Sequence, residues 1–188
     1  MKIHILSSTD RPGSNAKKVA DYISELLDKE AENRVFSLRD FPFEDVVGGR
    51  YGDEISSVKK FNDEFLDADG FLFVIPEYNG GFPGVLKLFF DYLPFPNALK
   101  KMPVSVVGEA AGSFGALRPV EHFQQLLGYR NALIYPERMF IKDVNNTFTP
   151  ESGLKNSKMQ ELLESQIRGF VEFSAMVKET RAQEILSM

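Results

Sequence analysis

One loop concentrates residues that shape a backbone around a ligand. Residues 76–84 read Pro-Glu-Tyr-Asn-Gly-Gly-Phe-Pro-Gly and follow the apolar run 71–75, which is typical of a buried strand. Glycine lets a backbone approach a ligand closely, and proline fixes the path of a loop. In an open parallel sheet, ligands bind beyond the carboxyl ends of the strands. The loop predicts a site for a flat, acceptor-rich ligand, and the alternative is a simple tight turn.

A second loop, residues 7–15, is rich in hydroxyl groups and ends at a predicted helix. It reads Ser-Ser-Thr-Asp-Arg-Pro-Gly-Ser-Asn. The free N–H groups and the dipole at a helix start favour an anion such as phosphate, and Arg11 can add a bidentate charged contact. Asp10 opposes an anion unless its side chain points away. The loop predicts a phosphate site, and the alternative is that Ser14 or Asn15 only caps the helix.

A third loop, residues 108–116, consists mainly of small residues that let a ligand approach the backbone. It lacks the Lys of a G-x-x-x-x-G-K-[ST] phosphate loop. Residues 111–115 are similar to a nucleophile elbow, but that hydrolase pattern requires an acid and then a His after the nucleophile. The last His of the chain, His122, comes only nine residues after Ser113. We therefore reject a catalytic triad, and with two His and no Cys we expect no metal site.

An alternation of strands and helices positions these loops. The apolar patterns predict strands at 2–7, 34–38, 71–75, 104–108 and 132–135. They predict helices at 16–27, 55–66, 85–93, 117–127 and 159–177. Right-handed crossovers then give a five-stranded parallel sheet covered on both faces, for which the strand order 2-1-3-4-5 is the common solution. The predicted fold class is α/β, a flavodoxin-like three-layer sandwich in which the loops after strands one, three and four lie side by side.

The composition limits the remaining possibilities. A chain of 188 residues with 43% hydrophobic residues is typical of one domain, here spanning residues 1–188. The net charge of −5 argues against a nucleic-acid partner, and no apolar run approaches the ~18 residues of a membrane span. The lack of Cys excludes thiolate catalysis and disulfides. Because the N-terminal residues show no signal-peptide cleavage region, we expect a cytoplasmic protein.

The loop at 76–84 and the helix after it carry a family resemblance. Residues 76–93 are similar to the pattern P-E-Y-N-G-S-x-P-G-x-L-K-N-x-x-D-x-L and differ from it at Gly81 and Leu88. In this the sequence resembles the NADPH-dependent FMN reductase family, which includes flavin-dependent quinone, azo-dye and chromate reductases. The resemblance covers residues 2–135.

The other two loops resemble further motifs of the same family. Residues 7–15 resemble G-S-x-R-x-x-S-x-N, with Ser7 in place of the first Gly and Asp10 as an insertion, and residues 115–118 resemble part of G-G-x-L-R. The resemblance implies FMN as cofactor, with its phosphate held by Ser8, Arg11, Ser14 and Asn15. It implies that the isoalloxazine ring is framed by Pro76, Glu77, Tyr78, Asn79 and Gly80. It implies that the other edge of the ring is approached by Gly112, Ser113 and Gly115.

The implied cofactor suggests a mechanism without a catalytic side chain, because flavin N5 carries the chemistry. A nicotinamide passes its C4 hydride to N5, and a small-molecule acceptor of the quinone, azo or flavin type then takes its place, which is ping-pong exchange. NADPH and NADH stay open as donors, and FMN stays open as bound cofactor or as substrate. The alternatives are a flavodoxin-type electron carrier and a non-catalytic FMN-binding protein.

The helix at 85–93 predicts an assembly. It is apolar nearly all round, and such a helix is buried on more than one side. A domain of this size covers one side with its own sheet, so we expect a homodimer or homotetramer through residues 83–95, as in the family's dimers. The alternative is an unusually thick local core.

Overall fold

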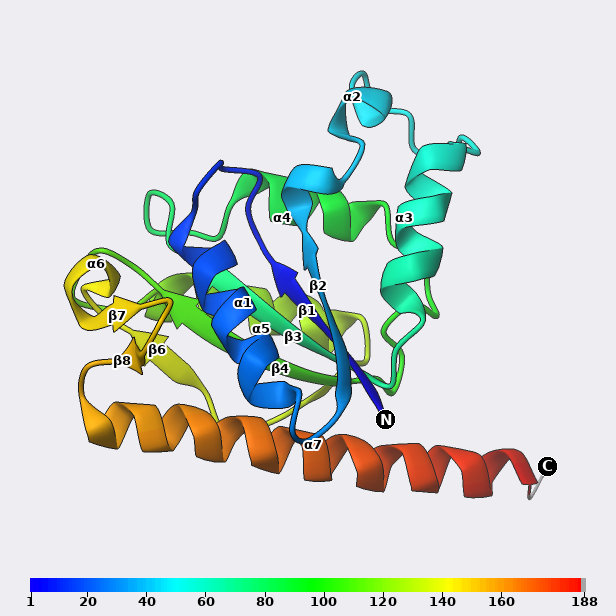
Figure 1. Cartoon of the computed structure of the whole chain (residues 1–188). Coiled ribbons are helices and arrows are strands. Elements are labelled where there is room, and N and C mark those ends of the chain that lie inside the picture. Colours follow the sequence, from blue (N-terminus) through cyan, green and yellow to red (C-terminus); the bar gives the residue numbers. More distant parts are fainter. Residues whose placement is uncertain (187–188) are drawn as a thin grey trace.

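A parallel sheet runs through the middle of the computed structural model, which describes residues 1–186 (Figure 1). Its strand order is β2-β1-β3-β4-β5, so the predicted flavodoxin-like α/β fold is confirmed. The strands are β1 (Lys2–Ser7), β2 (Glu32–Ser37), β3 (Gly70–Pro76), β4 (Pro103–Glu109) and β5 (Leu133–Ile134). Every residue of β3 and β4 is buried, which explains why these central strands read as continuous apolar runs.

The fifth position of the sheet is shared by two short strands. β5 pairs with the first residues of β4, and β6 (Met139–Ile141) pairs in parallel with the last residues of β4, from Val107 to Glu109. Pro136 lies between the two short strands, and proline has no N–H for a sheet ladder. The single strand predicted at 132–135 therefore ends early, and the sheet resumes at β6.

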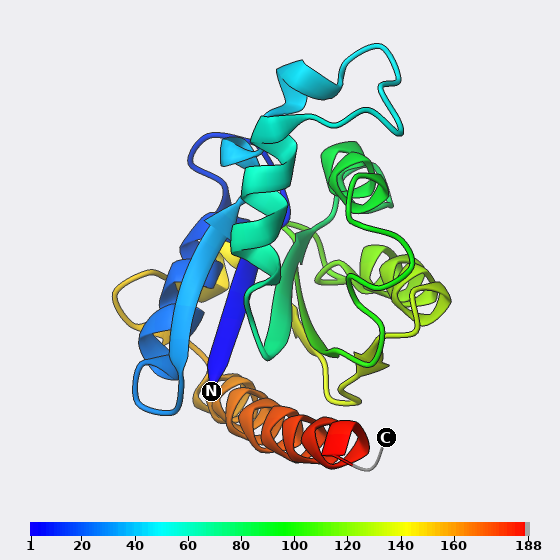
Figure 2. The ribbon, with the colours of Figure 1, turned by 90° about the vertical axis from the view of Figure 1, so that its right-hand side faces the viewer.

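Helices cover both faces of the sheet (Figure 2). One face carries α1 (Asn15–Leu27) and α7 (Ser157–Leu186), and the other carries α3 (Ser56–Leu66), α4 (Gly84–Asp91) and α5 (Leu117–Tyr129). Side chains alternate along the strands, so that Ile3 and Ile5 enter one buried cluster and Leu6 enters the other. The shorter elements are a 3-10 helix η1 (Leu38–Asp40), α2 (Phe43–Val46), α6 (Val144–Thr147), β7 (Phe148–Thr149) and β8 (Gly153–Leu154).

The second side of α4 is largely covered by this chain itself. Phe89 is fully buried and meets the rings of Phe41 and Phe65 edge-on, each at a centroid distance of 5.4 Å. Phe41 belongs to the segment at 39–54, between the predicted strand at 34–38 and the predicted helix at 55–66, in which the short helix α2 forms. The alternative of a thick local core thus accounts for most of the apolar surface of α4. Phe95, which is 68% exposed, stays outside this core.

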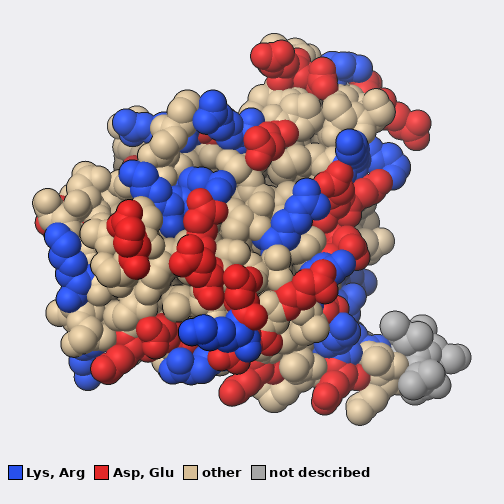
Figure 3. Space-filling view, viewed as in Figure 1, with Lys and Arg blue, Asp and Glu red and all other residues tan. Residues whose placement is uncertain are grey.

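The closing helix α7 is longer than the predicted 159–177. Leu163, Ile167 and Phe170 bury one side of it against the sheet, and its last turns extend past the rest of the molecule (Figure 1). Within residues 1–186, no helix has both the length and the apolar character that a bilayer span requires. On the face shown in Figure 3, positive and negative side chains are interspersed over the surface.

Candidate functional site

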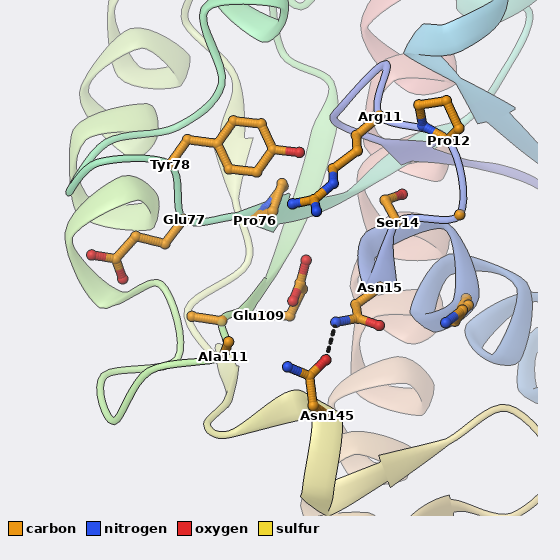
Figure 4. A pocket seen from close by; sticks show the side chains of 13 residues that line it. Arg11, Pro12, Ser14, Asn15, Pro76, Glu77, Tyr78, Glu109, Ala111 and Asn145 are labelled. Atoms are coloured by element: carbon orange, nitrogen blue, oxygen red, sulfur yellow. Dashed lines mark hydrogen bonds between the residues drawn. The ribbon is translucent and has the colours of Figure 1, made fainter.

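The loops after β1, β3 and β4 border a cavity of about 380 Å³ at the carboxyl edge of the sheet (Figure 4). The predicted convergence of these loops is therefore present. The cavity is lined by Arg11, Pro12, Gly13, Ser14, Asn15, Lys18, Pro76, Glu77, Tyr78, Glu109, Ala110, Ala111 and Asn145.

The loop after β1 brings the positive start of α1 to this cavity. Ser14 has extended backbone and its Oγ accepts a hydrogen bond from the N–H of Lys17 at 3.2 Å, so it is the N-cap of α1. The capping role considered as an alternative is real, but Ser14 also lines the cavity. The Arg11 side chain points into the space between the loops (Figure 4). Asp10, which would oppose an anion in the cavity, is exposed and does not belong to the lining.

The loop after β3 makes a tight turn at its tip. Asn79 and Gly80 have φ values of 53° and 78°, and Tyr78 and Gly81 exchange backbone hydrogen bonds of 2.8 and 3.0 Å. Positive φ at both central residues is the signature of a type I′ turn, for which Asn-Gly is the preferred pair. The turn holds Asn79 and Gly80 beyond the lining, whereas Pro76, Glu77 and Tyr78 face the cavity.

Thr9 connects the first two loops. Its hydroxyl lies 2.8 Å from the Tyr78 hydroxyl, and the same oxygen accepts a hydrogen bond from the N–H of Arg11 at 3.2 Å. This contact fixes the position of Tyr78 relative to the start of the Arg11 segment. Sequence reasoning missed the role of Thr9, because nothing local marks a partner 69 positions away.

Glu77 lines the cavity, but its side chain points toward α5 (Figure 4). Its carboxylate lies 3.6 Å from Arg118, whose guanidinium also sits 4.9 Å above the ring of Phe114. Glu77 thus has a positive partner on the side of the site that faces α5. The contact links the loop after β3 to the start of α5.

The loop after β4 contributes less to the lining than the sequence suggested. Ala110 and Ala111 face the cavity, whereas Gly112, Ser113 and Gly115 do not. Gly115 has a φ of 58°, and a Cβ on it would lie 2.9 Å from the backbone of Phe140. Its small size therefore serves the close packing of this loop on β6. The space around Gly112 is open.

Ser8 lies beneath the site rather than on its surface. It is fully buried, its hydroxyl donates a long hydrogen bond of 3.4 Å to the carbonyl of Leu6, and its N–H donates to the carbonyl of Val74. Ser8 therefore holds the loop after β1 against the sheet.

Glu109, the last residue of β4, is a residue of the site that sequence reasoning passed over. It is only 4% exposed and its carboxyl lies between the Arg11 and Glu77 sides of the cavity (Figure 4). Burial raises the pKa of this carboxyl to about 7, against the opposing pull of the Ala16 N–H and of the Arg11 charge. The sequence did contain a signal for this residue, because Glu109 is the one charged residue of the buried strand β4.

Asn145 also lines the cavity, although it lies 130 residues after Asn15 in the sequence. Its side-chain oxygen accepts a hydrogen bond of 2.8 Å from the Asn15 amide, which is the dashed line in Figure 4. Asn145 belongs to the short helix α6, which the sequence analysis did not predict. The site is therefore built from more of the chain than the three loops alone.

Comparisons with known proteins give matches along most of the chain. A family model described as NADPH-dependent FMN reductase matches residues 1–146. An NAD(P)H-dependent FMN reductase of Pseudomonas aeruginosa is 33% identical over 116 residues, which cover 60% of this chain and 62% of that protein. A quinone reductase of Escherichia coli is 27% identical over 183 residues, which cover 95% of this chain and 97% of that protein.

Solved structures share the fold. The flavoenzyme NAD(P)H:(acceptor) oxidoreductase FerB of Paracoccus denitrificans has a TM-score of 0.78 at 20% identity, over 93% of this chain and 97% of that one. A short-chain flavodoxin associated with a bacterial microcompartment has a TM-score of 0.61 at 15% identity, over 93% of this chain and 99% of that one. At these identities the likeness establishes the flavodoxin-like fold alone.

Proposed function

The chain belongs to the NADPH-dependent FMN reductase family, and from this premise we propose that it is an oxidoreductase that holds FMN in the cavity beside α1. We propose that it takes a hydride from NADPH or NADH and reduces a quinone-, azo- or flavin-type acceptor. The observation that carries the proposal is the meeting of Arg11, the start of α1 and residues 76–78 at one cavity on the carboxyl edge of the sheet.

The chemistry of the lining fits FMN. Arg11, Lys18 and the N-terminal end of α1 form a positive corner, which suits a phosphate group. Pro76 and Tyr78 supply flat, partly apolar walls on the other side, which suit a ring system. The buried carboxyl of Glu109 opposes a phosphate in this lining, unless it carries a proton.

When bound, FMN would supply the redox chemistry, which is hydride acceptance from the nicotinamide and transfer of two electrons to the acceptor. The protein's part is to bind, orient and polarise. Arg11 would hold the phosphate by charge-assisted hydrogen bonds, and the positive end of the α1 dipole would favour its charge. The Thr9–Tyr78 contact keeps the wall of the ring site in place, and the type I′ turn at 79–80 fixes the loop beyond it. Ser8 acts in this scheme by supporting the phosphate loop from below.

Ping-pong kinetics follow if the nicotinamide and the acceptor use the same open side of the cavity in turn. Backbone N–H groups of the loop after β3 and the small residues Gly112, Ser113 and Gly115 remain our candidates for the other edge of the ring. None of the three lines the cavity itself, so they are candidates for a part of the ring that extends beyond the lining.

Steady-state kinetics test the proposal. The purified protein, with and without added FMN, is assayed with NADPH and with NADH against a soluble quinone. We expect a yellow protein whose absorbance bleaches on addition of a nicotinamide, and parallel double-reciprocal plots. FMN that binds but is bleached only by a partner protein would identify an electron carrier. Failure to quench the fluorescence of FMN would refute FMN binding altogether.

We also propose that the protein assembles as a homodimer or homotetramer through the 83–95 segment. Support comes from the exposed end of this segment, where Phe95 stacks on Tyr129 at a centroid distance of 6.3 Å and both rings are mostly exposed. Beside them lies an apolar cavity of about 720 Å³ between α3 and residues 91–95. Large exposed aromatic groups that adjoin a groove are typical of protein interfaces.

A further inference from the structure

Glu109 is an acid in a pocket that is otherwise built for an anion. It is only 4% exposed, it lines the cavity, and its carboxyl is directed into it (Figure 4). In the part of the chain that the structure describes, no Lys or Arg forms an ion pair with Glu109. A buried carboxylate without a paired cation is costly, so this position calls for a further explanation.

The groups around Glu109 can be named element by element. The loop after β1 presents the guanidinium of Arg11, and α1 presents the N–H of Ala16 and, farther out, the ammonium of Lys18. The loop after β3 presents Glu77, which is already matched by Arg118. The residue facing it from α6, Asn145, is uncharged. The positive charge near Glu109 thus comes from the same corner that the proposed function gives to the phosphate of FMN.

We propose that Glu109 couples FMN binding to the uptake of one proton, an inference that rests on the proposed function of the cavity. The carboxylate and the phosphate compete for the positive corner at the start of α1. When the phosphate enters, the carboxylate takes a proton from solvent, and the resulting O–H donates a hydrogen bond to a phosphate oxygen. Protonation thereby turns Glu109 from a negative neighbour of the phosphate into a hydrogen-bond donor, and it removes the repulsion between the two groups.

The coupling has a definite pH range. Burial places the pKa of Glu109 at about 7 in the ligand-free protein, so the proton is half bound near neutral pH. A phosphate monoester has its second pKa near ~6, so FMN is a dianion above about pH 7 and contributes no further slope. Well above pH 7, each further pH unit lowers the affinity for FMN about tenfold, because binding takes up one proton and the proton concentration falls tenfold. Riboflavin has no phosphate, so its affinity stays level.

The experiment measures flavin binding from about pH 7 to pH 9 by fluorescence quenching. The wild-type protein, Glu109→Gln and the control Glu25→Gln, which changes an exposed acid on the outer part of α1, are titrated with FMN and with riboflavin. We expect the FMN dissociation constant to rise about 50-fold between pH 7 and pH 9 for the wild type and the control. We expect it to stay within about twofold for Glu109→Gln, whose amide donates at every pH.

Calorimetry on the wild type gives a readout that needs no variant. FMN is titrated near pH 8 in two buffers of different ionisation enthalpy, and we expect the uptake of about 0.9 proton per FMN. A wild-type affinity that does not change with pH, or no proton uptake, overturns the role of Glu109 and leaves the proposed function intact. An unchanged slope in Glu109→Gln also overturns it. If no protein binds FMN at any pH, the proposed function falls first, and this inference falls with it.

Discussion

At the scale of single residues, Arg11 is the charge that the proposed phosphate site depends on most. Its side chain projects into the cavity from a loop that is itself fixed by Thr9. Hydrogen bonds to charged groups contribute about 1.5–3 kcal/mol. We expect Arg11→Ala to weaken FMN binding by about 10- to 100-fold and to leave riboflavin binding nearly unchanged.

Fluorescence titration with both flavins is the measurement. Arg168→Ala is the matched control, because Arg168 is an exposed arginine on α7 whose contact with Glu164 is long, at 3.9 Å. An Arg11→Ala protein that retains the wild-type affinity for FMN would place the phosphate elsewhere.

Glu109 also predicts how the stability of the ligand-free protein depends on pH. Its folded pKa of about 7 lies above the reference value of 4.5, so the folded state binds the proton more tightly than the unfolded state. Its stabilising contribution is complete below about pH 4.5 and is lost as the pH rises through about 7. The shift corresponds to about 3 kcal/mol. The contribution of His4, whose pKa is lowered by burial, has the opposite sign and is lost as the pH falls.

Urea unfolding of the ligand-free protein at pH values from about 5 to 8 measures this contribution. His4 is common to the wild type and Glu109→Gln, so its effect cancels in their difference. We expect the free energy of unfolding of the wild type, relative to Glu109→Gln, to fall by about 2–3 kcal/mol over this range. A constant difference between the two proteins would mean that Glu109 does not titrate with a raised pKa.

At the scale of elements, the glycines of the loop after β4 have separate tasks. Gly115→Ala places a Cβ against the Phe140 backbone at a positive φ, and we expect a loss of more than ~1 kcal/mol of stability. Gly112→Ala meets open space, so we expect a change in stability within about 0.5 kcal/mol. If the flavin edge approaches Gly112 as proposed, the same variant loses FMN affinity. Thermal unfolding and flavin titration separate these effects, and equal stability losses would contradict the assignment.

The secondary-structure elements differ in how well they can be predicted from the sequence. The strand β3 and the loop at 76–84 were predictable, because the apolar run and the glycines and prolines act locally. β6 was missed because a three-residue strand beyond Pro136 is too short to show a period. α6 was missed for the same reason, and with it Asn145. The close approach of Gly115 to Phe140 could not be predicted, because it depends on that unpredicted strand.

The same limit applies within the site. Arg11, Ser14, Asn15 and residues 76–78 were found from the sequence, because their loops follow predictable strands. The roles of Thr9 and Glu109 depend on contacts with other elements, Tyr78 for Thr9 and the start of α1 for Glu109, and no local sequence pattern reveals such contacts. The family prediction is confirmed by the match over residues 1–146, whereas the individual site residues stay predictions until a flavin is titrated.

At the scale of the whole molecule, the Phe95–Tyr129 surface predicts an assembly in solution. Phe95 is 68% and Tyr129 is 72% exposed, and water contact of two stacked rings is unfavourable. We expect the wild type to sediment as a dimer or tetramer and Phe95→Ser to sediment as a smaller species. Leu162→Ser, which changes an exposed apolar residue on α7, is the control. A monomeric wild type would refute assembly through this segment.

The amide contact between Asn15 and Asn145 joins positions 130 residues apart. A ribosome releases residues in order, so α1 emerges long before Asn145 and longer still before the buried side of α7. In a growing chain, the loop at 7–15 is therefore exposed to solvent before Asn145, which borders the same cavity, has been synthesised. A ligand that uses the whole lining of the cavity can therefore bind only after Asn145 has been synthesised.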